Sequence, residues 1–427
     1  MGPECFVFCL SFCFLMALEH GARPHAIDGL YFQKYTSDRM MQTLPCAILR
    51  ERPWQALFYL HIQPPMLDAI RALLAQFADS LRALDSVLYV VWGLIYACIA
   101  TLIFHWIARL ATRRWAAFAV LAWCLHPAAL FCATLLDSTQ LSGLLVFWLL
   151  FELWRAKTSR RLGPFRLSLA VACVFLTRTV FQWYCLPVLA LALLLMGFRL
   201  RRVFLSLSLC AVVVLLLVTK QYVLYRTLST STFSGYHYCG LFWYKPSEAE
   251  LNGARAALAP VYPEGAEPVS AQYNTADVFA DNLVYTKACR DAIAANPGML
   301  FRIARSIRQN VRVFFWPTVW AGRNAITDRL PWRWLYDRVF GGVGYVLLVA
   351  FVCLVWVRDK RRRSLPVLSR AELGLLVPVA YTFTIVNLGN RYDWVESHRL
   401  KFLLEPAFFV FLVCRIRSLC SVRMRRG

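Results

Sequence analysis

Seven polar side chains lie beside hydrophobic segments of this chain, in positions where they could carry out chemistry. Asp38, in Ser37-Asp38-Arg39-Met40-Met41-Gln42, is a carboxylate that can take a proton from a hydroxyl group. His61 and Gln63, just before Pro64-Pro65, can hydrogen-bond a sugar or a phosphate. The other four are cations that can neutralise a leaving phosphate, namely Arg178, Lys220, Arg399 and Lys401. A base and cations beside apolar segments fit the transfer of a group from a lipid phosphate.

The acids and the histidine also have ordinary structural interpretations. Asp38 lies near the expected start of a helix that runs to about Leu49 and is bent by a proline, so it could simply cap that helix. His61 follows an aromatic and apolar stretch, where a histidine is more often structural. Asp28 and Asp137 are further acids that could assist Asp38, although Asp137 also fits a polar turn.

The cations have alternatives of the same kind. Arg178 interrupts an apolar stretch, 167–197, and a charge in the membrane interior costs about 2.5 to 3.5 kcal/mol. We therefore expect Arg178 in the turn of a helical hairpin, at the outer interface. Arg178 and Lys220 could bind a phosphate there or simply snorkel to the interface. Arg399 and Lys401 belong to the last outer connection, whose aromatic residues could instead anchor the chain at the interface.

Composition predicts the elements that position these residues. The 427-residue chain is 59% hydrophobic, with a mean hydropathy of +0.52. Open sheets cannot span lipid, so we predict an all-α polytopic membrane protein with about ten transmembrane helices. The predicted spans lie near residues 5–18, 88–108, 116–134, 139–154, 167–177, 183–197, 203–224, 339–357, 373–388 and 402–414.

The net charge of +23 is concentrated in a few connections. Five segments carry 22 of the 47 Lys and Arg residues and a single acid, Asp359. These segments are 109–114, 155–166, 198–202, 358–371 and 415–427. They fall at every second connection, as the positive-inside rule requires when both termini are cytoplasmic. This distribution indicates membrane topology and argues against nucleic-acid binding.

We divide the chain into three parts. Residues 1–225 form a seven-span module whose outer loop, 19–87, carries Asp38 and the Pro-Pro pair. Residues 226–338 form a second outer loop, and residues 339–427 form three spans and a basic cytoplasmic tail.

Two interfacial helices are expected in the outer loops. One begins at Pro65 with an apolar stripe that includes Leu67, Leu73 and Phe77, opposite Asp68 and Arg71. The other runs from about Met299 to Phe315. Its basic stripe comprises Arg302, Arg305, Arg308 and Arg312, a pattern that suits anionic lipid headgroups or a dedicated lipid-phosphate site.

Several motifs resemble the GT-C superfamily of membrane glycosyltransferases. The family-39-like bacterial enzymes, related to protein O-mannosyltransferases and to the lipid A aminoarabinose transferase, are the most similar members. The motifs, in order, are Ser37-Asp38-Arg39, Leu60-His61-Ile62-Gln63-Pro64-Pro65, Leu176-Thr177-Arg178, Lys220-Gln221, and His398-Arg399-Leu400-Lys401-Phe402 with Glu405-Pro406. The resemblance in the order of these motifs extends over most of the chain. Two departures are Arg39, where many relatives have a second acid, and Gln63, where some have a basic residue.

This resemblance implies an inverting transfer of a sugar from a polyprenyl-phosphate donor to an acceptor on the outer face of the membrane. The acceptor is a glycan, a lipid or a protein, and Asp38 would be the base. We expect no metal, cofactor or nucleic acid, with membrane lipids as further partners. The absence of Asn-x-Ser/Thr sequons favours a bacterial inner membrane with a periplasmic site. The alternatives are a transporter or flippase of a lipid-linked or anionic substrate, and a non-catalytic lipid-binding scaffold.

Overall fold

The computed structural model describes most of the chain as helices joined by short connections. It leaves out residues 1, 27–42, 135, 160–162, 180, 234, 236–238, 240–241, 243, 260–261, 264–265, 267–273, 316–333, 336–337, 339–341, 363–369, 389–400 and 424–427. No strand occurs in the rest of the chain, so the all-α class predicted from the sequence is confirmed.

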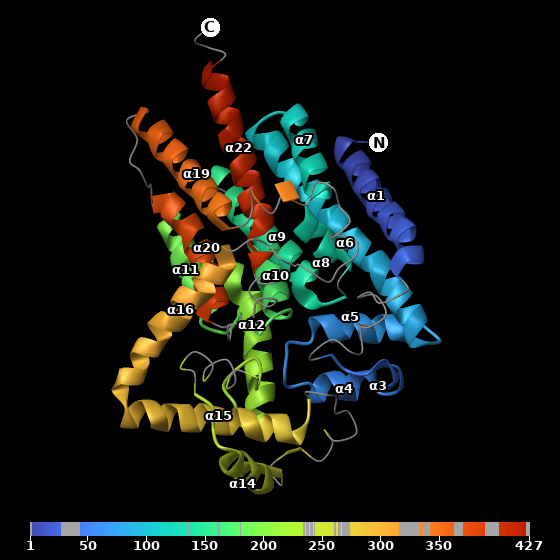
Figure 1. Cartoon of the computed structure of the whole chain (residues 1–427), viewed down its shortest axis with the longest axis vertical. Helices are drawn as coiled ribbons and strands as arrows, with labels where there is room; N and C mark the ends of the chain where they lie inside the picture. The colour runs from blue at the N-terminus through green and yellow to red at the C-terminus, as the bar shows by residue number, and fades with distance from the viewer. Residues whose placement is uncertain are drawn as a thin grey trace.

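The helices form a long bundle with further helices at one end (Figure 1). The bundle contains α1 (Pro3–Ala26), α6 (Leu81–Leu110), α7 (Arg113–Cys124), α8 (Pro127–Thr134), α9 (Ser138–Ser159), α10 (Pro164–Phe175), α11 (Cys185–Leu195), α12 (Leu200–Tyr225), α19 (Gly342–Arg362), α20 (Arg370–Leu388) and α22 (Glu405–Arg423). The other elements are α3 (Cys46–Glu51), α4 (Pro53–Tyr59), α5 (Met66–Ala75), α14 (Glu248–Leu258), α15 (Ala276–Ala295), η4 (Pro297–Met299) and α16 (Leu300–Phe315).

Both ends of the described chain lie at the same end of the bundle. In Figure 1, α1 begins and α22 ends at the top, whereas α3, α4, α5, α14 and α15 lie at the bottom. We call the bottom the far end. The orientation of the bundle in the membrane stays a prediction.

The helices differ from the predicted spans in several places. The helix α6 begins before the predicted span 88–108, because Ser80 accepts a hydrogen bond from the Ala83 amide and caps the helix there. The outer loop 19–87 stays a prediction. The third predicted span is two helices, since the proline at 127 cannot continue α7. Thr43 and Leu44 are not helical and α3 begins after Pro45, so the predicted helix bent at that proline is wrong over these residues.

Length and composition single out two helices. Among the described residues, α6 and α12 are long and apolar enough to cross a membrane. The 26 residues of α12 would extend roughly 39 Å, more than the hydrocarbon core of about 30 Å. Leu215 and Leu216 on this helix are each 65% exposed, as expected of a surface that faces lipid. The total of ten spans stays a prediction.

Aromatic packing joins the bundle helices. Trp92 on α6, Trp123 on α7 and Phe147 on α9 are fully buried, and Trp106 stacks on Phe147 with ring centroids 5.4 Å apart. Between membrane helices such rings stabilise the bundle through close packing contacts, because lipid is as apolar as the protein interior. This packed core fixes the ends of the helices from which the candidate residues project.

Candidate functional site

Three motifs that are far apart in the sequence meet at the far end of the bundle. The Met66 amide, directly after Pro64-Pro65, donates a hydrogen bond of 2.8 Å to the carbonyl of Leu176. Lys220 Nζ on α12 donates to the Leu60 carbonyl at 2.6 Å, and Gln221 Nε2 donates to the His61 carbonyl at 3.4 Å. The segment that carries the Pro-Pro pair is therefore held against the ends of α10 and α12.

Lys220 acts on the last turn of α4. Its Nζ also lies 3.4 Å from the Leu57 carbonyl, so it donates to two carbonyl groups at the C-terminus of that helix. Carbonyls at a helix C-terminus have no partners within the helix, and a cation there also meets the negative end of the helix dipole. Lys220 therefore stabilises the backbone just before His61.

His61 is part of the folded core. Its side chain is fully buried, with Nδ1 2.6 Å from Thr232 Oγ1 and Nε2 3.3 Å from the hydroxyl of Tyr262. Its backbone amide donates to Asn274 Oδ1 at 2.9 Å, and its ring packs on Tyr225 with centroids 4.6 Å apart. These contacts join the first outer segment to the second and match the structural interpretation of His61.

The environment of His61 favours the neutral imidazole. Burial, assisted by the positive charge of Lys220, lowers the pKa of His61 to about 3. The Thr232 and Tyr262 hydroxyls can each donate or accept, so they satisfy one donor and one acceptor on the neutral ring.

We expect mild acid to weaken the fold through His61. In the unfolded chain its pKa is about 6.5, so between pH 3 and 6.5 the unfolded state binds more protons and stability falls as the pH falls. The slope is at most about 1.4 kcal/mol per pH unit. Thermal unfolding midpoints at pH 7 and pH 5 test this, because the drop should be smaller in His61→Gln. An equal drop in the variant would count against it.

Gln63 belongs to a buried network around Asp68. Gln63 Nε2 donates to Asp68 Oδ2 at 2.9 Å, and Arg71 Nη1 donates to Asp68 Oδ1 at 2.8 Å. The same acid accepts from the Leu44 amide at 3.2 Å, and Arg71 donates to the Leu44 carbonyl at 2.6 Å. Burial raises the pKa of the Asp68 carboxyl, an effect that the Arg71 charge and the hydrogen bonds oppose. Asp68 and Arg71 together thus bind both the backbone amide and the carbonyl of Leu44.

The network buries one side of α5. Asp68 and Arg71, which were expected opposite the apolar stripe, have no exposed side-chain surface. Leu73 and Phe77 of that stripe are 63% and 82% exposed, as expected of a stripe that packs against acyl chains. The physical reason is that a paired acid and base can be buried when hydrogen bonds satisfy them, while the apolar stripe can face lipid.

Arg178 lies in the connection between α10 and α11, as the hairpin interpretation predicted. Its Nη2 donates to Thr139 Oγ1 at 2.5 Å and lies 3.9 Å from Asp137 Oδ2. Asp137 caps α9 by accepting from the Thr139 amide at 2.7 Å. These three residues form a cationic and acidic group at the start of α9, with 12% of the Arg178 side chain exposed.

Lys401 directly precedes Phe402, which packs on the same helix. The lysine is fully buried, with Nζ 4.0 Å from Glu405 Oε1. The neighbouring Phe402 ring covers Gly143 of α9, where a Cβ atom would lie 2.9 Å from the ring. Glycine at position 143 thus allows the end of the last outer connection to approach α9, one turn beyond the group formed by Asp137, Thr139 and Arg178.

The remaining candidates fall outside the described residues. They are Asp38, its possible helper Asp28, and Arg399. In the part of the chain that the structure does describe, no three His, Cys, Asp or Glu side chains lie together as a metal site would require.

Several residues that build this region have no distinguishing signal in the sequence. Asn274 and Gln182 both bridge distant segments, Asn274 to His61 and Gln182 Oε1 to the Thr230 amide at 3.1 Å. Neither residue belongs to a periodic pattern or a motif, so no local signal marks it. The Asp68 and Arg71 spacing of three residues does suggest an ion pair, but an exposed pair has the same spacing.

Comparisons with known proteins show no family. No family model matches the chain. The MFS-type efflux transporter phmH of Phaeosphaeria nodorum is 32% identical over 88 residues, which is 17% of this chain and 15% of that protein. The chain therefore spans about a seventh of the length of the curated relative it matches. The crystal structure of ArnT from Cupriavidus metallidurans in the apo state is 16% identical and covers 81% of this chain and 71% of that chain, with a TM-score of 0.34. A likeness of this degree carries no argument about activity.

Proposed function

We propose that this chain is a membrane glycosyltransferase of the GT-C type that moves a sugar from a polyprenyl-phosphate donor to an acceptor at the far end of the bundle. One observation supports it most. Motifs chosen by their order in the sequence are in contact, because the Pro-Pro segment bonds to Leu176 and to the Lys220-Gln221 pair. Such convergence is expected when separated segments build one site.

In this proposal the contacting residues divide into scaffold and substrate-binding groups. His61, Gln63 and Lys220 hold the backbone, so we assign them a positioning role and not a direct contact with the donor. Arg178 is partly exposed beside Asp137, and we assign it the role of binding the leaving phosphate. Asp38 remains the proposed base for the acceptor hydroxyl.

Replacing Arg178 tests the phosphate assignment. Arg178→Gln removes the charge that would stabilise the departing phosphate, so we expect transfer to fall roughly 10²-fold, with partial recovery in Arg178→Lys. Initial rates measured over a range of donor concentrations give this comparison. Arg226→Gln, at an exposed arginine at the end of α12, is the control. A wild-type rate in Arg178→Gln would remove Arg178 from the site.

A panel of donors tests the function itself. Purified protein in proteoliposomes would receive polyprenyl-phosphate sugars labelled on the sugar, together with lipid and glycan acceptors. We expect label from at least one donor to become attached to an acceptor. Label that crosses the bilayer while still attached to its polyprenyl phosphate would favour the transporter alternative instead.

A further inference from the structure

The helix α16, which rises from the far end toward α20, is strongly cationic (Figure 1). Residues 300–315 contain four arginines and no acid. The helix follows α15 after a short turn and packs on α20 and α19 at the edge of the bundle (Figure 1). Its inner side carries the buried Ser306 and Asn310.

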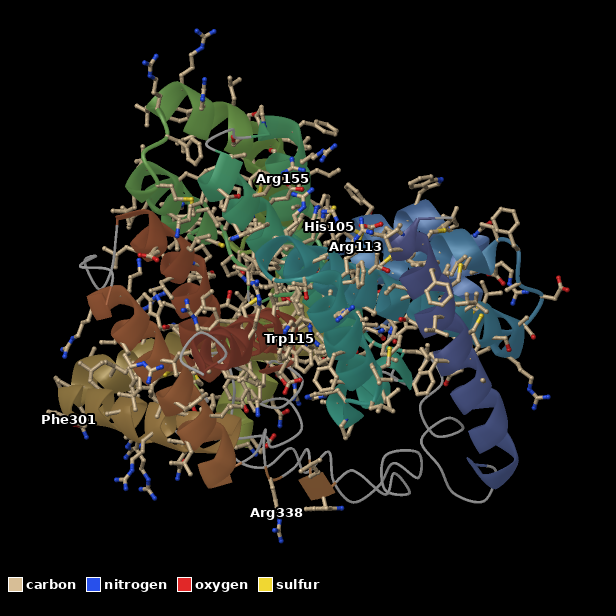
Figure 2. All side chains as sticks on the ribbon, turned by 90° about the horizontal axis from the view of Figure 1, so that it is seen from above. His105, Arg113, Trp115, Arg155, Phe301 and Arg338 are labelled. Atoms are coloured by element: carbon tan, nitrogen blue, oxygen red, sulfur yellow. The ribbon has the colours of Figure 1, made fainter. Side chains whose placement is uncertain are left out.

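One side of α16 combines an exposed aromatic ring with exposed arginines. Phe301 is 82% exposed, and Arg305 and Arg308 are also exposed. At 100° per residue these three fall within an arc of about 60°, roughly opposite Ser306 and Asn310. Figure 2 shows Phe301 at the periphery of the molecule. We call Phe301, Arg305 and Arg308 the α16 outer face.

We propose that the α16 outer face binds the anionic phospholipid headgroups of the membrane leaflet at the far end of the bundle. Guanidinium groups pair with phosphate oxygens, and an exposed ring on the same face can enter the boundary between headgroups and acyl chains. Because residues 300–315 contain no acid, every charged side chain of α16 is positive and attracts anionic headgroups. Two exposed arginines near an anionic membrane surface strengthen the binding of α16 to that surface, and salt weakens this attraction.

The proposed partner of the α16 outer face is the bulk phospholipid of the membrane and not the polyprenyl-phosphate sugar donor. Arg302, which faces a different direction, donates to the Phe242 carbonyl at 3.4 Å and so helps to hold α16 on the second outer segment. The helix would thereby be fixed between the protein and the leaflet. This inference is independent of the proposed transfer reaction.

Local hydrogen exchange tests the proposal on the full chain. The protein would be placed in nanodiscs of phosphatidylcholine alone or of equal parts phosphatidylcholine and phosphatidylglycerol. We expect peptides from α16 to exchange more slowly in the anionic discs, and peptides from α14 to exchange equally in both. High salt should remove most of the difference.

Two matched variants test whether the slowing depends on the α16 outer face or on net charge alone. Arg305→Gln with Arg308→Gln should abolish the slowing, whereas Lys287→Gln with Arg290→Gln, two exposed cations on α15, should preserve it. The proposal is overturned if α16 exchanges equally in the two discs, if the α16 variant keeps the slowing, or if the α15 variant loses it. Slowing produced by inorganic phosphate in the phosphatidylcholine discs would also overturn it, because the site would then bind a soluble anion.

Discussion

Asp68→Ala is expected to be the most destabilising of the substitutions considered, lowering the free energy of unfolding by about 3 to 5 kcal/mol. The Asp68 and Arg71 side chains are both fully buried, with Nη1 and Oδ1 2.8 Å apart. Removing the acid leaves a guanidinium charge in the interior without its counter-charge. It also leaves the Leu44 amide without its acceptor, a loss of roughly 1 to 3 kcal/mol that the same figure includes.

A double variant tests whether the loss of stability comes from the unpaired buried charge. Asp68→Leu combined with Arg71→Met removes both charges, so it should be considerably more stable than Asp68→Ala, though still below the wild type because Leu44 loses both partners. Thermal unfolding in detergent micelles measures both. If the double variant were no more stable than Asp68→Ala, charge burial would not be the cause.

Asp38→Asn is expected to have the largest effect on activity. Asparagine keeps the shape of the side chain but cannot take the proton of the acceptor hydroxyl, so transfer should fall roughly 10²- to 10⁴-fold. The amount of protein in the membrane should not change. Initial rates of sugar transfer in proteoliposomes measure this effect.

Asp79→Asn is the matched control. Asp79 is an exposed acid in the same segment between α1 and α6, and its backbone carbonyl, not its carboxylate, accepts the hydrogen bond from Arg50 Nη1. Its substitution should leave the rate near that of the wild type. Wild-type transfer by Asp38→Asn would show that another group is the base.

Helices could be predicted from the sequence because apolar runs and their periodicity are local. The predicted span 203–224 is α12, Leu200–Tyr225, and the basic helix expected from Met299 is α16, Leu300–Phe315. The helix expected after Pro65 is α5, Met66–Ala75. Each of these elements is specified by residues within a few turns of one another.

The direction of a polar face and the contacts across long separations could not be predicted. Periodicity placed Asp68 on one side of α5 but could not show that this side faces Leu44. Likewise, 213 residues separate His61 from Asn274, and only the folded chain brings them together. The proposed location of the site therefore rests on motif order, whereas the hydrogen bonds of His61, Gln63 and Lys220 could be seen only in the structure.

The most direct test of glycosyl transfer is the stoichiometry of donor consumption. Wild-type protein in proteoliposomes would receive an active polyprenyl-phosphate sugar, and free polyprenyl phosphate and sugar-bearing acceptor would be quantified together. We expect equal amounts of the two products, both strongly reduced in Asp38→Asn. Translocation of intact donor without release of polyprenyl phosphate would contradict it.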